Sequence, residues 1–116
     1  ADQNDANSQN SLGLVYLEGT KIEQDIEKGI KYMTLAADNN YLLAQYNLAN
    51  IFINGKYIKP NIDKAIHYFS LAADQNFIDA QYELGMIYYE GKYIPQNINK
   101  AIRYFSIKTL IKQFII

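Results

Sequence analysis

The chain has no cysteine, no tryptophan and a single histidine among its 116 residues. The absence of cysteine excludes disulfides, thiolate metal sites, cysteine nucleophiles and redox pairs. One histidine, His67, cannot form the imidazole cluster of a typical zinc site. The sequence also contains no glycine-rich phosphate loop, nucleophile elbow or sequential metal motif. These absences predict a protein that is not an enzyme and that has no catalytic residue, resident metal or other cofactor.

Long apolar runs and a strong net charge are missing as well. No run approaches the ~20 residues that cross a bilayer, and the formal net charge is -1 with a pI near 5.7. Because a protein that binds nucleic acid must neutralise many phosphates, we expect neither a nucleic-acid nor a membrane partner. No targeting peptide and no Asn-x-Ser/Thr glycosylation site are visible, which leaves the compartment open and favours the cytoplasm.

The chain contains a unit of 36 residues that is repeated three times. Residues 44–71 and 80–107 are identical at 17 of 28 positions, and residues 8–37 follow the same pattern more loosely. A fixed period of this length is typical of repeat proteins. The identities that recur in all three copies include Leu12, Leu48 and Leu84; Gly19, Gly55 and Gly91; Lys28, Lys64 and Lys100; and Tyr32, Tyr68 and Tyr104.

Each unit is predicted to form two helices. In the second copy Ala44, Leu48, Ile51 and Phe52 lie at i, i+4, i+7 and i+8, which is one helical stripe, and Gly55 follows where a left-handed residue ends a helix. Pro60 then prevents the helix from continuing. The second helix covers residues 62–73, and its predicted N-caps in the three copies are Asp25, Asn61 and Asn97.

The second helix of each unit is apolar around much of its girth, so it must be contacted on more than one side. A stack of antiparallel helix pairs provides those contacts. The predicted fold is therefore all-α, a superhelical α/α solenoid of about three repeats. Small residues recur where the two helices of a unit should approach most closely, at Gly13, Ala49 and Gly85 and at Gly29, Ala65 and Ala101.

We interpret the whole chain, 1–116, as a single repeat domain. Residues 1–4 align in register with the tail of the second helix at 37–40 and 73–76, so 1–7 is expected to be the remnant of a preceding repeat in a longer array. The repeats are predicted at 8–43, 44–79 and 80–107. A C-terminal helical extension is predicted at 108–116, because Lys108 and Thr109 replace the usual Ala-Ala pair while apolar residues continue at helical spacing.

The third copy resembles the Sel-one-like repeat family, a relative of tetratricopeptide repeats. The pattern is Ala-x-x-x-Leu-Gly-x-x-Tyr-x-x-Gly, an N-cap residue, Lys-Ala and an aromatic pair, with Ala72-Ala73 preceding it. Its residues are Ala80, Leu84, Gly85, Tyr88, Gly91, Asn97, Lys100, Ala101, Tyr104 and Phe105. The resemblance implies a tetratricopeptide-like superhelix that acts as an adaptor or scaffold for protein complexes. The chain is unlike the cysteine-rich branch of that family.

Candidate partner-binding residues form a second stripe on the first helix of each unit. They vary between copies and are expected on the concave face of the stack, where aromatic and methionine side chains typically anchor peptides. Packing against the neighbouring first helices is the alternative explanation. The candidates are Tyr46, Asn50, Ile53, Tyr82, Met86 and Tyr89, and their counterparts in the first copy are Asn10, Leu14 and Leu17.

Cationic side chains recur on the second helix of each unit, at Lys28, Lys31, Lys64, His67, Lys100 and Arg103. They suggest either a phosphate track or a solvated face, and the interleaved acidic residues favour the solvated face. Because His67 occupies the position of Lys31 and Arg103, a surface role is favoured over a general base acting with a nearby carboxylate in a small hydrolase.

The predicted function is a non-enzymatic interaction scaffold that binds a peptide or protein segment on the concave face. The alternative is a regulatory repeat region of a multidomain enzyme such as a protein kinase. The C-terminal helix, with Ile107, Leu110, Ile111, Phe114 and Ile115 on one face, could cap the solenoid, pair with a second copy or lie on a membrane.

Overall fold

The computed structural model describes the backbone of residues 3–115 and the side chains of residues 5–106. The described residues form six helices and no strand, so the all-α prediction is confirmed. The helices are α1 (Gln3–Glu18), α2 (Ile26–Asp38), α3 (Leu42–Asn54), α4 (Ile62–Asp74), α5 (Ile78–Glu90) and α6 (Ile98–Ile115). We call α1, α3 and α5 the A helices, and α2, α4 and α6 the B helices.

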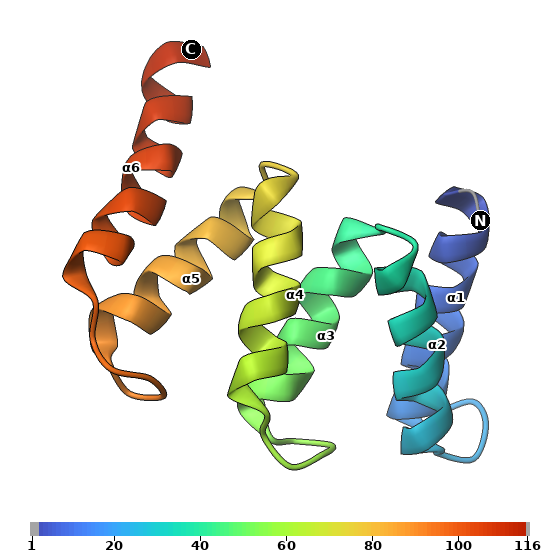
Figure 1. The fold of residues 1–116 in the computed structure, drawn as a ribbon. Helices are drawn as coiled ribbons and strands as arrows, with labels where there is room; N and C mark the ends of the chain where they lie inside the picture. The colour runs from blue at the N-terminus through green and yellow to red at the C-terminus, as the bar shows by residue number, and fades with distance from the viewer. Residues whose placement is uncertain (1–2, 116) are drawn as a thin grey trace.

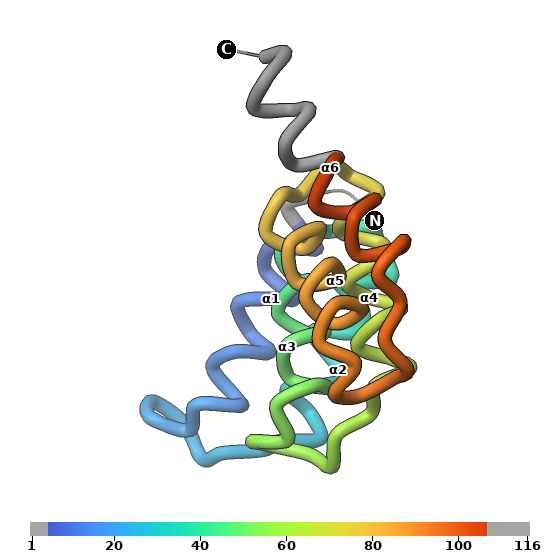
Figure 2. Tube along the Cα trace, turned by 90° about the vertical axis from the view of Figure 1, so that its left-hand side faces the viewer, coloured from blue at the N-terminus to red at the C-terminus, as the bar shows by residue number. Residues whose placement is uncertain are grey.

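Three A–B hairpins stand side by side in chain order (Figure 1). The most extensive contacts join α1 to α2, α3 to α4 and α5 to α6 within hairpins, and α2 to α3 and α4 to α5 between them. Figure 2 looks along the stack from the α5–α6 end, and the successive hairpins lie behind one another with a sideways offset. The chain therefore forms the predicted solenoid, with principal extents of 44 × 32 × 21 Å.

The loop between the A and B helices of a hairpin begins at the C-cap of the A helix and ends at the N-cap of the B helix, and both kinds of cap are as the sequence predicts. Gly55 and Gly91 are left-handed C-caps, with φ of 71° and 65°. The side chains of Asp25, Asn61 and Asn97 accept hydrogen bonds from the backbone N–H three residues on, at 3.0, 3.1 and 3.0 Å. Each cap satisfies one N–H that the first turn of a helix leaves without a partner. The predicted caps are thus confirmed.

The B–A turns use a left-handed asparagine, which the sequence analysis did not identify. Asn40 and Asn76 have φ of 66° and 65°. Asn40 N–H donates to the Ala37 carbonyl at 3.0 Å, and Tyr41 N–H donates to the Ala36 carbonyl at 3.1 Å. This pair of bonds is a Schellman motif, in which asparagine replaces the more usual glycine because its short polar side chain tolerates this conformation.

Helix α1 runs without a break from Gln3 and is longer than α3 and α5. Residues 3–7, expected to be the tail of a preceding helix, therefore lie in the same helix as the body of the first repeat. Residues 3–7 contain no glycine or proline, so the i to i−4 hydrogen bonds of the helix can run through them.

Each hairpin contains a three-layer stack of one lysine and two rings. Tyr16 stacks on Tyr32, Phe52 on Tyr68 and Tyr88 on Tyr104, with ring centroids 5.9, 6.1 and 6.0 Å apart and the planes within 7° of parallel. The ammonium groups of Lys28, Lys64 and Lys100 lie 5.3, 5.3 and 4.9 Å from the centroids of the A-helix rings. The repeated tyrosines are therefore packing residues that join the two helices of each hairpin.

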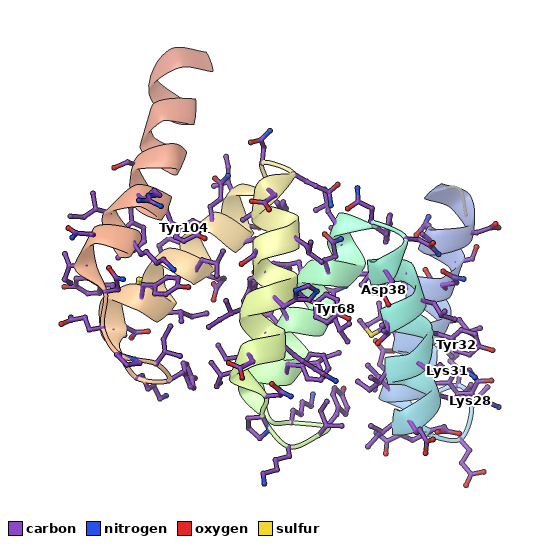
Figure 3. All side chains as sticks on the ribbon, viewed as in Figure 1. Lys28, Lys31, Tyr32, Asp38, Tyr68 and Tyr104 are labelled. Atoms are coloured by element: carbon purple, nitrogen blue, oxygen red, sulfur yellow. The ribbon has the colours of Figure 1, made fainter. Side chains whose placement is uncertain are left out.

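Neighbouring hairpins are linked by a polar contact at the B–A turn. Tyr68 on α4 donates a hydrogen bond of 3.4 Å to the carboxylate of Asp38 at the end of α2 (Figure 3). Burial raises the pKa of the Tyr68 phenol, and the adjacent Asp38 charge raises it further. Because this shift moves the pKa above its ordinary value of 10.0, Tyr68 keeps its proton, and hence the bond, at neutral pH.

A buried glutamine fastens the start of α3. The Gln45 side chain is 1% exposed, and its Nε2 donates to the Ala37 carbonyl at 3.1 Å and to Asn40 Oδ1 at 3.3 Å. Its Oε1 accepts from Gln75 Nε2 at 2.9 Å, so every polar atom of Gln45 has a partner. The amide network holds the turn between the first two repeats.

The equivalent glutamine of the third repeat is incompletely bonded. Gln81 Nε2 donates to the Ala73 carbonyl at 3.2 Å, but its buried Oε1 has no hydrogen-bond partner. The residue 36 positions after Gln75 is Ile111, which has no side-chain N–H to donate. The network is therefore not repeated at the last hairpin.

Candidate interaction surface

The predicted stripe is largely packed in the second repeat. Tyr46 on α3 is only partly exposed, and its ring contacts Phe69 of α4 and Phe77 at the N-cap of α5, with centroids 5.8 and 5.0 Å apart. Ile53 packs against the core, and Asn50 donates to the Tyr46 carbonyl at 3.2 Å. The contact of Tyr46 with Phe77 matches the packing alternative, because Phe77 belongs to the next hairpin.

The counterparts in the first repeat are packed to a similar or greater degree. Leu17 and Asn10 are 1% and 6% exposed, and Leu14 packs against the core. Asn10 Oδ1 is buried without a hydrogen-bond partner. These residues leave little side-chain surface on α1 for a partner.

The stripe is accessible on α5. Tyr82 and Tyr89 are 42% and 53% exposed, and Met86 is half-buried. The Tyr82 ring contacts the Phe105 ring of α6, and the two ring centroids are 6.0 Å apart. Tyr46 differs because the ring of Phe77, at the start of the next hairpin, covers it in addition to the ring of Phe69 in its own hairpin. The structure thus places Tyr82, Met86 and Tyr89 where a partner can reach them.

Three acidic residues that the sequence analysis did not select lie beside this stripe. Asp79, Glu83 and Glu90 fall at i, i+4 and i+11 on α5, the spacing of one helical face. At ~100° per residue they share an arc of about 120° with Tyr82, Met86 and Tyr89. We call these six residues the α5 outer face. The opposite face of α5, which includes Ala80, Leu84 and Ile87, is buried.

The electrostatics of this face centre on Glu83. Its pKa is raised above the ordinary value of 4.5, mainly because partial burial removes water from the carboxylate, and also because Asp79 and then Glu90 add negative charge nearby. All three causes disfavour the charged form. The ionised form of Glu83 therefore lowers the folding stability.

We expect Glu83→Gln to stabilise the fold at neutral pH and to have no such effect in acid. Because the folded-state pKa is raised, Glu83 favours folding below its unfolded pKa and opposes it as the pH rises through the folded value. Urea unfolding of both proteins at about pH 7 and about pH 4 measures the difference. Glu27→Gln, at an exposed acid on α2, controls for net charge. Equal curves for Glu83→Gln and the parent at both pH values would contradict the prediction.

The six cationic residues of the B helices are all exposed, as expected for a solvated face. Three of them, Lys28, Lys64 and Lys100, also place their ammonium groups over A-helix rings; Figure 3 labels Lys28 and Lys31 on α2. The periodicity of these lysines did not predict this ring contact. His67 contacts the Tyr68 ring edge-on at 4.9 Å.

The described residues contain no candidate metal centre. No group of three or more His, Asp or Glu side chains among them could hold a metal ion. Two surface depressions lie at the start of α2 and its preceding loop, one lined by Tyr16, Ile22, Glu23, Gln24 and Asp25, and the other by Asp25, Glu27, Lys28 and Lys31. Neither includes His67 or any residue of the predicted stripe.

The predicted amphipathic tail falls outside the described side chains. Helix α6 extends to Ile115, which makes it longer than α2 and α4. The side chains of Ile107, Leu110, Ile111, Phe114 and Ile115 are outside the described residues. No described helix is long and apolar enough to cross a membrane.

A profile of the Sel1 repeat family matches the chain three times, at residues 6–41, 42–77 and 78–107. Each matched repeat begins two residues before the corresponding predicted one. A search of curated proteins finds no match.

Solved structures share the fold. A Sel1 repeat protein from Oxalobacter formigenes is 27% identical, with a TM-score of 0.80 over 92% of this chain and 44% of its own. A protective antigen of uropathogenic Escherichia coli with an SLR fold is 25% identical, with a TM-score of 0.82 over 90% of this chain and 22% of its own. Cysteine rich protein B of Helicobacter pylori is 21% identical, with a TM-score of 0.68, and covers 96% of this chain and 91% of its own. The chain thus spans less than half the length of the first two proteins.

Proposed function

The chain belongs to the Sel1 repeat family, and from this membership we propose that it is a non-enzymatic adaptor module that binds a peptide or protein segment through its A helices. Sel1 repeat proteins are generally protein–protein interaction modules and typically non-enzymatic scaffolds. The observation that carries the proposal is the exposure of two large aromatic side chains, Tyr82 and Tyr89, on one helix face.

The rest of the structure supports binding by shape rather than by chemistry. Tyrosines presented on a helix offer large contact area with few rotatable bonds, which keeps the entropic cost of binding low. The half-buried Met86 between them provides an adaptable apolar contact. Because α5 is fastened to α4 and α6 by a buried core, the face is held in place before a partner arrives.

The six candidate partner-binding residues have two different roles in this proposal. Tyr82, Met86 and Tyr89 contact the partner directly. Tyr46 acts mainly by fixing the position of α5 relative to α3, since its ring packs on Phe77 at the start of α5. Asn50 and Ile53 stabilise the second repeat itself, through a bond within α3 and through core packing. A variant at Tyr46 would therefore disturb the fold, and we leave it out of the test.

The proposal is tested by selecting peptides from a random library displayed on phage against the wild-type chain. We expect Tyr82→Ala/Tyr89→Ala to weaken the selected peptides by about tenfold or more, because hot-spot aromatics each contribute 1 kcal/mol or more. Ile98→Ala/Ile102→Ala is the matched control, since these α6 side chains are 43% and 55% exposed.

The selection has three distinguishable outcomes. Loss of binding in the tyrosine variant alone supports the A-helix face. Equal affinity in all three proteins, or loss in the isoleucine variant alone, would move the binding site off this face. Failure to select any peptide would count against the adaptor function itself.

A further inference from the structure

Charge is segregated between the two layers of the solenoid. The A helices contain no lysine or arginine, and their charged residues are Asp5, Glu18, Asp79, Glu83 and Glu90. All 11 basic residues of the chain lie on the B helices or in loops. The net charge of -1 therefore conceals an A layer that is purely acidic and a remainder that is net positive.

Within the A layer the negative charge gathers on α5. Helix α3, the preceding A helix, has no charged residue of either sign, and α1 has only Asp5 and Glu18, near its two ends. The three carboxylates of the α5 outer face thus have no cation on a neighbouring A helix. Cations of the third hairpin lie in the loop after α5 and on α6, at Lys92, Lys100 and Arg103, but the charges that shift the pKa of Glu83 are those of Asp79 and Glu90, which are both negative. A basic partner would therefore add positive charge where the face carries net negative charge.

The apolar part of the same face favours the same kind of partner. Tyr82 and Tyr89 flank Met86, and an exposed tyrosine ring attracts a lysine or arginine as well as an apolar side chain. The chain itself uses this contact in every hairpin, where a lysine ammonium lies about 5 Å from an aromatic ring. Glu83 is partly desolvated, so a cation placed beside it interacts more strongly than it would with a fully hydrated carboxylate.

We propose that the segment bound by the α5 outer face is a basic amphipathic peptide, whose lysine or arginine side chains face Asp79, Glu83 and Glu90 while its apolar side chains contact Tyr82, Met86 and Tyr89. This inference rests on the proposed adaptor function and names the chemistry of its partner. An acidic segment is disfavoured, because it would bring like charge onto a face that already repels itself.

The test uses two synthetic peptides of about 15 residues that share every leucine position and differ only at the polar positions, which are all lysine in one and all glutamate in the other. Fluorescence anisotropy measures their affinity for the full chain. The lysine peptide is expected to bind at least about tenfold more tightly, and its affinity is expected to fall as the salt concentration rises from about 0.05 to about 0.15 M.

Two variants with the same change in net charge locate the effect. Asp79→Asn/Glu83→Gln/Glu90→Gln neutralises the α5 outer face, and Glu23→Gln/Glu27→Gln/Asp63→Asn neutralises three exposed acids outside the A helices. The first variant is expected to lower the affinity of the lysine peptide by about tenfold, and the second by less than about twofold. Equal losses in both variants would show attraction to overall charge and would overturn the inference. Circular dichroism spectra confirm that both variants are folded.

The outcomes separate this inference from the function on which it rests. If both peptides bind equally and Tyr82→Ala/Tyr89→Ala weakens both, the adaptor function stands and the basic partner is wrong. If the lysine peptide does not bind at all, the basic partner is also wrong, and the phage selection then decides the adaptor function independently.

Discussion

Replacing Phe69 by alanine is expected to lower the free energy of unfolding by about 3–5 kcal/mol. The Phe69 ring on α4 is fully buried and lies 5.8 Å from the ring of Tyr46 on α3. Its removal leaves a cavity in the middle hairpin, which packs on both of the others. Because small domains are stable by only about 5–15 kcal/mol, the variant is expected to be close to unfolding at ambient temperature.

Phe105→Ala is the matched control, because Phe105 occupies the same position in the third repeat. Its ring is partly exposed, so its deletion removes less buried area and a smaller loss is expected. Urea unfolding followed by circular dichroism measures both variants. Equal losses would contradict the expectation that the fully buried Phe69 ring stabilises the fold more than the partly exposed Phe105 ring.

Replacing Gly13 by alanine is expected to destabilise the fold by about 1–3 kcal/mol. In an unconstrained helix the same change stabilises by about 0.5–1 kcal/mol, so the sign of the effect is diagnostic. A Cβ on Gly13 of α1 would lie 2.8 Å from the backbone carbonyl oxygen of Gly29 on α2 and closer still to the Met33 side chain. The two helices would have to move apart to accept it.

Gly85→Ala tests whether backbone contact is the cause. A Cβ on Gly85 would meet the ring of Phe105 at 2.5 Å, but that ring is a partly exposed side chain that can rotate away. We therefore expect a smaller penalty than for Gly13→Ala in the same thermal unfolding experiment. A stabilised Gly13→Ala variant would show that the contact between α1 and α2 adjusts freely.

Most of the fold could be predicted because its determinants are local and repeated. The period of 36 residues, the left-handed Gly55 and Gly91 and the N-caps Asp25, Asn61 and Asn97 all depend on neighbouring residues in the sequence. The left-handed Asn40 and Asn76 could have been found in the same way. An asparagine recurs two residues after the last residue of α2 and α4, where a Schellman turn requires this conformation.

The candidate surface could be predicted only in part, because exposure depends on the position of a helix in the stack. Tyr46 and Tyr82 occupy the same position of the repeat, yet Tyr46 contacts the next A helix through Phe77 while Tyr82 is 42% exposed. Nothing in the helical periodicity distinguishes the two. Lys64 is exposed, as its spacing predicts, but the contact of its ammonium group with the Phe52 ring depends on how the two helices pack and cannot be predicted from that spacing.

The pattern of contacts, in which hairpins pack mainly on their neighbours in sequence, has a mechanical consequence. Tension applied between the ends of the chain loads the joints between hairpins in series, and no strand or disulfide in the described residues clamps distant segments together. One hairpin can then detach while the others remain folded. Each 36-residue unit would release roughly 120 Å of extended chain. We therefore expect the module to lengthen in steps under load, and a partner bound across two hairpins to resist that extension.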